Sequence, residues 1–105
     1  MSHSIEVSWS GDSVAIVTFR DPPRHNQICW AAIDGLAQQL RFCRESGARV
    51  VILASGLEGH WLEHAWLRDL SNGVQGREQT GNGTGWFESL AELTHESVIS
   101  IAAIS

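Results

Sequence analysis

The sequence contains no lysine and no tyrosine, and all seven of its cationic residues are arginine. A lysine Schiff base and a tyrosine acid are therefore excluded within this chain. The net charge of −5 disfavours nucleic acid as a partner, because affinity for phosphate backbones comes from Lys and Arg. No apolar run approaches the ~18 residues that cross a bilayer, and the first four residues lack the basic start of a signal peptide. We expect a cytoplasmic protein with no membrane partner.

Cysteine is scarce as well. The sequence has two, Cys29 and Cys43, and their separation fits neither a zinc-binding nor a redox motif. Both are predicted to be reduced, partly buried side chains that behave as small apolar groups, so no metal site is expected from them. A length of 105 residues is typical of one domain, which we predict to span residues 1–105.

The first half of the chain has the pattern of a strand pair followed by a helix. Residues 5–9 alternate between apolar and polar, residues 14–19 are largely apolar, and a turn-forming cluster separates them, which predicts a β-hairpin. Two prolines exclude regular structure over residues 20–26, where Asn26 can serve as a helix N-cap or an Asx-turn residue. Apolar side chains then recur at helical spacing from Cys29 to about Glu45, and Gly47 is placed to end that helix.

Residues 49–54 (RVVILA) are rich in β-branched side chains and predict a strand buried on both faces, as in a parallel sheet. Ligands in such folds bind beyond the carboxyl ends of the strands, so residues 55–70 are the candidate site. A short helix is predicted over residues 65–70 and a glycine-rich loop over residues 71–85. An amphipathic helix from Trp86 and a last strand over residues 98–104 complete the pattern.

Four segments together resemble the first half of the crotonase (enoyl-CoA hydratase/isomerase) superfamily. Residues 22–28 (PPRHNQI) are similar to the family's Pro-x-x-x-Asn turn, and residues 49–53 (RVVIL) to its Arg-Val-Val-Val-Leu strand. Residues 61–67 (WLEHAWL) are similar to Phe-x-Ala-Gly-x-Asp-Leu, and residues 98–105 (VISIAAIS) to Lys-Pro-x-Ile-Ala-Ala-Ile-x-Gly, one residue short of the Gly. The resemblance covers the whole chain and the N-terminal half of a family domain. It implies an α/β fold, a partial ββα spiral in which amphipathic helices pack on a small mixed sheet.

The resemblance also implies a function, that of an acyl-CoA-binding domain of the kind used in fatty acid metabolism. The CoA thioester would be the substrate, and no further cofactor is expected. In the family two backbone N–H groups form an oxyanion hole for the thioester carbonyl; the matching group here is the N–H of Ala65, while the second donor and the acid–base carboxylates match no residue of this sequence. We therefore predict no hydratase activity for this chain alone and leave open whether it is an enzyme. The implied contacts to acyl-CoA are Arg24, His25, Leu62, His64, Trp66 and Leu67.

Three positions depart from the family's pattern. His64 stands in place of a glycine, Trp66 in place of an aspartate, and Val98-Ile99 in place of a Lys-Pro pair. A histidine fits the glycine position only where φ is not positive, and we expect Trp66 to add apolar surface to the acyl pocket. Both changes indicate altered substrate choice or lost activity.

Other interpretations stay open. His60, Glu63 and His64 match the H-x-x-E-H pattern of inverted zinc peptidases, but a zinc hydrolase is less favoured, because the segment follows two glycines and offers no obvious third ligand. Arg24 and His25 could instead belong to a solvated loop. The alternative function is a non-catalytic oligomerisation module, since the last strand leaves an unpaired edge, and on either interpretation we expect a homo-oligomer.

Two further groups of side chains have simple structural explanations. Glu88 and Glu92 share one helix face, which indicates a solvated acidic surface more readily than a catalytic pair. Trp9, Trp30 and Trp86 are predicted to provide packing surface in the core or at an interface.

Overall fold

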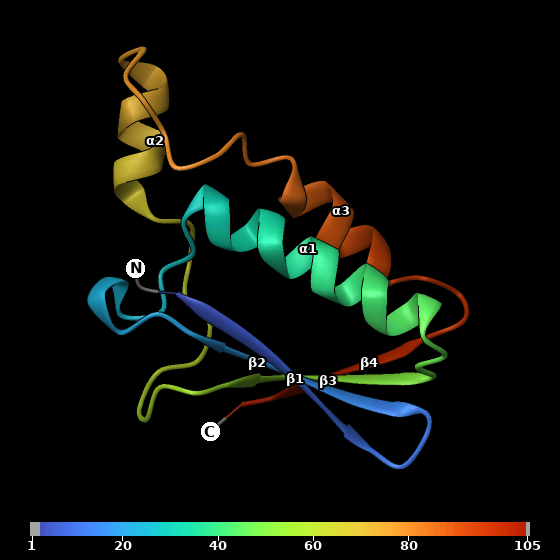
Figure 1. Ribbon diagram of the computed structural model, residues 1–105. Helices are drawn as coiled ribbons and strands as arrows, with labels where there is room; N and C mark the ends of the chain where they lie inside the picture. Colours follow the sequence, from blue (N-terminus) through green and yellow to red (C-terminus); the bar gives the residue numbers. More distant parts are fainter. Residues whose placement is uncertain (1–2, 105) are drawn as a thin grey trace.

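The computed structural model describes residues 3–104 as a mixed sheet with helices packed on one face (Figure 1). The strands lie in the order β1-β2-β3-β4, and β3 is parallel to both of its neighbours while β1 and β2 are antiparallel. The predicted α/β class with a small mixed sheet is therefore confirmed. The strands are β1 (Ser4–Ser10), β2 (Val14–Arg20), β3 (Val50–Ser55) and β4 (Ile99–Ala103).

Three α-helices are present within the described residues. α1 (Trp30–Glu45) crosses one face of the sheet, and α3 (Gly85–Leu93) lies beside it. α2 (Leu67–Val74) projects away from the sheet near the start of α1 (Figure 1). No helix within residues 3–104 combines the length and the apolar character needed to cross a bilayer. Ser105, the last residue of the fourth motif, lies outside the described residues.

The core lies between the sheet and α1. Alternate side chains of β2, from Ala15, Val17 and Phe19, are buried in it, as the period of a strand requires. Cys29 and Cys43 are free thiols, as predicted, but they are fully rather than partly buried, and burial raises the pKa of Cys43. Each large apolar side chain buried in this core stabilises the fold by about 1.5–3 kcal/mol. The buried residues of α1 are Ala32, Ile33, Leu36, Ala37, Leu40 and Cys43.

The local elements of the first half agree with the sequence patterns. β1 and β2 form the predicted hairpin, with Val7 opposite Val17. α1 ends at Glu45, and Gly47 follows with φ of +99°, a conformation that glycine adopts without a steric penalty. The Ala48 amide donates to the Cys43 carbonyl at 2.9 Å, which is the Schellman arrangement of a helix end.

Two predictions about the helices are wrong. Asn26 does not cap α1; Cys29 holds that position, because the Asn26 side chain is engaged elsewhere. The short helix begins at Leu67 rather than at residue 65 and continues to Val74, into the predicted loop. Its apolar side chains at Leu67, Leu70 and Val74 have helical spacing, a signal that Gly73 obscured.

β3 is not buried on both faces, contrary to the prediction. Val51 is fully buried, whereas the other β3 residues are only half-buried. β4 is exposed along its whole length, with 65% of Ile99 and 47% of Ile101 accessible. The cause is tertiary: α1 and α3 cover a single face of the sheet, and the described chain provides no layer for the other.

α3 approaches α1 at a glycine. A Cβ on Gly85 would lie 2.5 Å from the carbonyl oxygen of Ile33, so only glycine fits at this crossing. The Gly85 amide donates to the Asp34 carboxylate at 2.9 Å, which satisfies one of the free amides at the start of α3. Trp30 and Trp86 pack against the core beside this contact, whereas Trp9 is 37% exposed.

Candidate functional site

The candidate site is built on an extended segment that follows β3. Ile28 pairs with Ala65 in an isolated parallel bridge, in which the Ile28 amide donates to the His64 carbonyl and the Trp66 amide donates to the Ile28 carbonyl, both at 2.9 Å. The Glu63 amide donates to the Asn26 carbonyl at 2.9 Å. The turn before α1 therefore sets the position of residues 63–66.

The backbone of Ala65 lies at the free edge of this bridge. Ile28 bonds to the residues on either side of its partner, so the N–H and C=O of Ala65 point away from Ile28, as parallel pairing requires. The carbonyl of Ala65 contacts Nδ1 of His64 at 2.8 Å. The Ala65 N–H donates no hydrogen bond to any residue of the described chain, and it lies outside a helix, because α2 begins at Leu67. The Ala65 N–H can therefore donate a hydrogen bond to an oxygen atom of a ligand.

Asn26 is the buried residue that organises the turn. Its Oδ1 accepts from the Asp21 amide at 2.7 Å, and its Nδ2 donates to Ser55 Oγ at 2.9 Å. Ser55 in turn donates to the His60 carbonyl and accepts from the Leu57 amide at 3.1 Å. These bonds join the proline turn, the end of β3 and the loop that leads to the site.

An apolar cavity of about 190 Å³ lies beside this segment, between α1, β3 and α3. Leu62, one of the predicted contacts, lines it. Two polar residues also line it: Glu63, whose side chain is 40% exposed, and Ser89, which is 3% exposed. The lining residues are Ile28, Ile33, Leu36, Leu53, Trp61, Leu62, Glu63, Trp86, Ser89, Leu90 and Leu93.

Trp66, which we expect to add apolar surface to an acyl pocket, is not among the residues that line this cavity. Its ring lies under the guanidinium of Arg24, 4.4 Å from the ring centroid, and Arg68 approaches it at 5.9 Å. These cation–π contacts place Trp66 in a separate hollow that it shares with Asp69 and Thr80.

The remaining predicted residues lie around the segment rather than in the cavity. His64 and Leu67 are exposed, and His64 is not among the residues with positive φ, so the histidine occupies the family's glycine position without backbone strain. Arg24 forms an ion pair with Asp21, 3.2 Å from Nη1 to Oδ2. His25 has φ of +53°, and its ring centroid lies 5.8 Å from that of His60.

The zinc pattern does not have the geometry it needs. Residues 60–66 are extended or bent rather than helical, so His60 and His64 do not share a helix face. His60 Nδ1 lies 3.8 Å from Glu63 Oε2, and His64 is directed to the Ala65 carbonyl. Within residues 3–104 no three His, Cys, Asp or Glu side chains are grouped to hold a metal ion.

The sequence patterns missed the importance of Asp69. Its buried carboxylate accepts from the Trp30 amide at 2.7 Å, from the Thr80 amide at 2.9 Å and from the Thr80 hydroxyl at 2.6 Å. Burial by itself would raise the pKa of Asp69, but the hydrogen bonds from Thr80 and Trp30 outweigh it and lower the pKa. Asp69 therefore fixes α2 and the following loop to the start of α1. An acidic residue in the first turn of a helix was the available signal.

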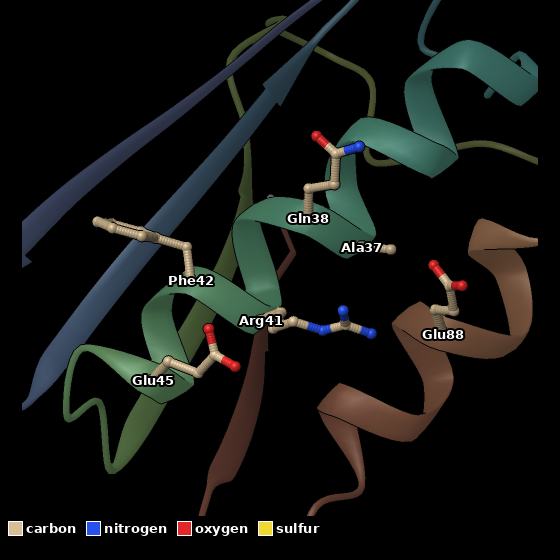
Figure 2. A pocket seen from close by; sticks show the side chains of 6 residues that line it. All are labelled: Ala37, Gln38, Arg41, Phe42, Glu45 and Glu88. Carbon is tan, nitrogen blue, oxygen red and sulfur yellow. The ribbon is translucent and has the colours of Figure 1, made fainter.

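A second hollow, of about 170 Å³, lies on the outer surface of α1 and α3. Arg41 extends from α1 toward Glu88 on α3 (Figure 2). The prediction of a solvated acidic face is wrong for Glu92, because its side chain is 10% exposed and forms ion pairs with Arg44 and Arg41. This region joins the two helices and lies apart from the Ala65 segment.

Sequence comparison finds no matching protein-family model and no matching curated protein. Comparison of the fold does find solved structures. An enoyl-CoA hydratase assigned to polyketide biosynthesis in Bacillus subtilis superposes with a TM-score of 0.73 at 23% identity, over 94% of this chain and 39% of that one.

Two further structures have the same fold. A dehydratase/decarboxylase couple involved in polyketide β-branching gives a TM-score of 0.69 at 17% identity, over 93% of this chain and 40% of that one. An enoyl-CoA hydratase/isomerase family member gives 0.62 at 17% identity, over 93% and 38%. The chain thus spans about two fifths of the length of these structures. At these identities the likeness shows the fold, and the predicted partial crotonase-like fold is confirmed.

Proposed function

We propose that this chain binds an acyl thioester such as acyl-CoA. The Ala65 N–H donates to the thioester carbonyl oxygen, and the acyl group enters the cavity lined by Leu62. The observation that carries the proposal is an unpaired backbone donor at Ala65, two residues after the segment Trp61-Leu62-Glu63 that lines an apolar cavity, in a fold similar to that of enoyl-CoA hydratases.

The Ala65 N–H forms half of an oxyanion hole. A preorganised donor of this kind contributes about 3 kcal/mol to stabilising an enolate-like transition state, and it does so only if the backbone is already in place. The bonds from Ile28 and Asn26 to residues 63–66 provide that rigidity. One donor without an acid–base pair does not complete a hydratase, so the chain alone binds the thioester without hydrating it.

The CoA portion then lies over the proline turn. His25 is exposed, and the Arg24 guanidinium, which pairs with Asp21, lies over Trp66, so this turn offers polar and aromatic surface to the pantetheine part of CoA. His64 and Leu67 are exposed on the same segment as Ala65, which supports them as further contacts.

Titration calorimetry with butyryl-CoA on two variants of one residue tests the proposal. Ala65→Pro removes the N–H but leaves the bonds of His64 and Trp66 to Ile28, whereas Ala65→Gly keeps the donor. We expect Ala65→Pro to bind about fivefold more weakly or worse, with Ala65→Gly close to the parent chain. Thermal melting establishes that both variants are folded. Equal affinities of the two folded variants, or the absence of butyryl-CoA binding to the parent chain, would contradict the proposal.

An association module is the second candidate. Its support is the exposed apolar surface of β4, where Ile99 and Ile101 are 65% and 47% accessible, together with the unpaired edge of that strand. We expect a homo-oligomer that Ile99→Glu with Ile101→Glu dissociates, measured by light scattering after size exclusion. A monomeric parent chain that binds butyryl-CoA would eliminate this candidate and retain the first.

A further inference from the structure

The apolar cavity lined by Leu62 contains one polar group that the fold leaves unpaired. Ser89 on α3 lines the cavity and is 3% exposed, and its Oγ has no hydrogen-bond partner among residues 3–104. A serine in a helix commonly donates to the carbonyl four residues earlier, yet Ser89 makes no such bond to Gly85. Because buried polar groups in native proteins are nearly always hydrogen-bonded, this hydroxyl needs an explanation.

The surroundings of Ser89 are those of a ligand pocket. Its neighbours around the cavity are apolar apart from Glu63, and small-molecule sites are typically apolar with a few polar groups that fix the orientation of the ligand. A volume of about 190 Å³ exceeds the ~150 Å³ of a protein cavity that accepts benzene. The cavity therefore accommodates an acyl group of about six non-hydrogen atoms.

We propose that Ser89 selects acyl groups that carry a neutral oxygen, a hydroxyl or a ketone, within the chain. This inference rests on the proposed thioester function and specifies its substrate class. A serine hydroxyl both donates and accepts, so it pairs with either oxygen type. A carboxylated acyl group is disfavoured, because burying its charge in an apolar cavity costs free energy and the Glu63 carboxylate, which lines the same cavity, has the same sign.

Two matched pairs of thioesters measure the preference. Butyryl-CoA is compared with 3-hydroxybutyryl-CoA and acetoacetyl-CoA, and hexanoyl-CoA with 5-hydroxyhexanoyl-CoA, by titration calorimetry on the parent chain. We expect at least one oxygenated member to bind about tenfold more tightly than its alkanoyl counterpart. Succinyl-CoA, which carries a carboxylate, should bind more weakly than butyryl-CoA.

Ser89→Ala should abolish the preference, so that within this variant the oxygenated and alkanoyl members of each pair bind with affinities that differ by no more than about twofold. Ser71 is an exposed serine on α2, so Ser71→Ala is the control and should keep the preference for oxygenated thioesters. Alkanoyl-CoA binding with no preference in the parent chain, or a preference that survives in Ser89→Ala, overturns the role of Ser89 while the thioester function stands. Failure of every thioester to bind overturns the proposed function and this inference with it.

Discussion

Glu92 on α3 binds Arg44 on α1 through two hydrogen bonds, 2.6 Å from Nε to Oε1 and 3.1 Å from Nη2 to Oε2. This bidentate geometry is the strong form of a carboxylate–guanidinium pair. The hydrogen bond from Arg44, followed by the charges of Arg44 and Arg41, lowers the pKa of Glu92 despite its partial burial. Since α1 and α3 form two walls of the apolar cavity, the pair also maintains the shape of the candidate site.

The Glu92 pair predicts a pH dependence of stability. A carboxylate whose pKa is lowered in the folded state stabilises the fold above its unfolded pKa of about 4.3 and loses that contribution as pH falls through the folded value. We expect the urea midpoint of unfolding to fall between about pH 5 and about pH 3, and Glu92→Gln to reduce the slope in that window. Glu88→Gln leaves the Arg44 pair intact and should retain the slope of the parent chain. An unchanged slope in Glu92→Gln would rule out this role.

Substitution of the buried Asp69 should reduce the stability of the fold strongly. Asp69→Ala leaves the amides of Trp30 and Thr80 without their acceptor, and we expect it to lower the free energy of unfolding by about 3 kcal/mol. Asp69→Asn retains one acceptor oxygen, so its free energy of unfolding should fall by less than that of Asp69→Ala. Asp12→Ala, in the exposed hairpin turn, should change stability by no more than about 0.5 kcal/mol. Urea unfolding measures all three, and equal effects of the two alanine variants would contradict the prediction.

Two helical glycines should respond in opposite directions to alanine. Gly85→Ala places its Cβ 2.5 Å from the Ile33 carbonyl oxygen, which is backbone and cannot move aside, so we expect a loss of about 1–3 kcal/mol. In Gly35→Ala the new Cβ meets only Ile5 Cδ1 at an ordinary 3.5 Å, and a gain of about 0.5–1 kcal/mol is expected from helix propensity. Thermal melting compares them. A stabilising Gly85→Ala would mean that α1 and α3 are not in close contact there.

Asn26 combines a left-handed backbone with two buried side-chain bonds. Its φ is +62°, so Asn26→Ala loses the bonds to Asp21 and Ser55 and also strains the backbone, at a total of about 3 kcal/mol. Asn26→Gly loses the same bonds without the strain and should be about 1 kcal/mol more stable than Asn26→Ala. Urea unfolding gives this difference. The Trp66 amide donates to the Ile28 carbonyl. If the turn positions the site, hydrogen exchange of this amide should accelerate in both variants.

The elements that could be predicted from the sequence are those decided by neighbours along the chain. Alternation over residues 5–9 and 14–19 specified the hairpin, and helical spacing with Gly47 specified α1 and its end. The motif at residues 61–67 also located the Ala65 segment. In each case the deciding contacts are local, or the pattern repeats over several turns; in the shorter α2 a single exception, Gly73, was enough to obscure the pattern.

The site residues that escaped prediction have partners far along the chain. Asp69 bonds Trp30 across 39 positions, and Arg44 reaches Glu92 across 48, so the local pattern reveals the partner of neither residue. Trp66 is absent from the lining of the apolar cavity, and its ring contacts the guanidinium of Arg24 instead. Ser89 is an ordinary helix residue until α1 and the loop at Leu62 close a cavity around it.

By itself the sequence determined the periodicities, the turns and the order of elements, because hydrophobic spacing and the backbone limits of Gly and Pro act within a few residues. The tertiary structure alone decided which faces are covered, since β3 has the composition of a strand buried on both sides and yet receives helices on only one. It also decided that the N–H of residue 65 is left unpaired, because Ile28 bonds to the His64 carbonyl and the Trp66 amide, and the Ala65 N–H points to the opposite side of the segment.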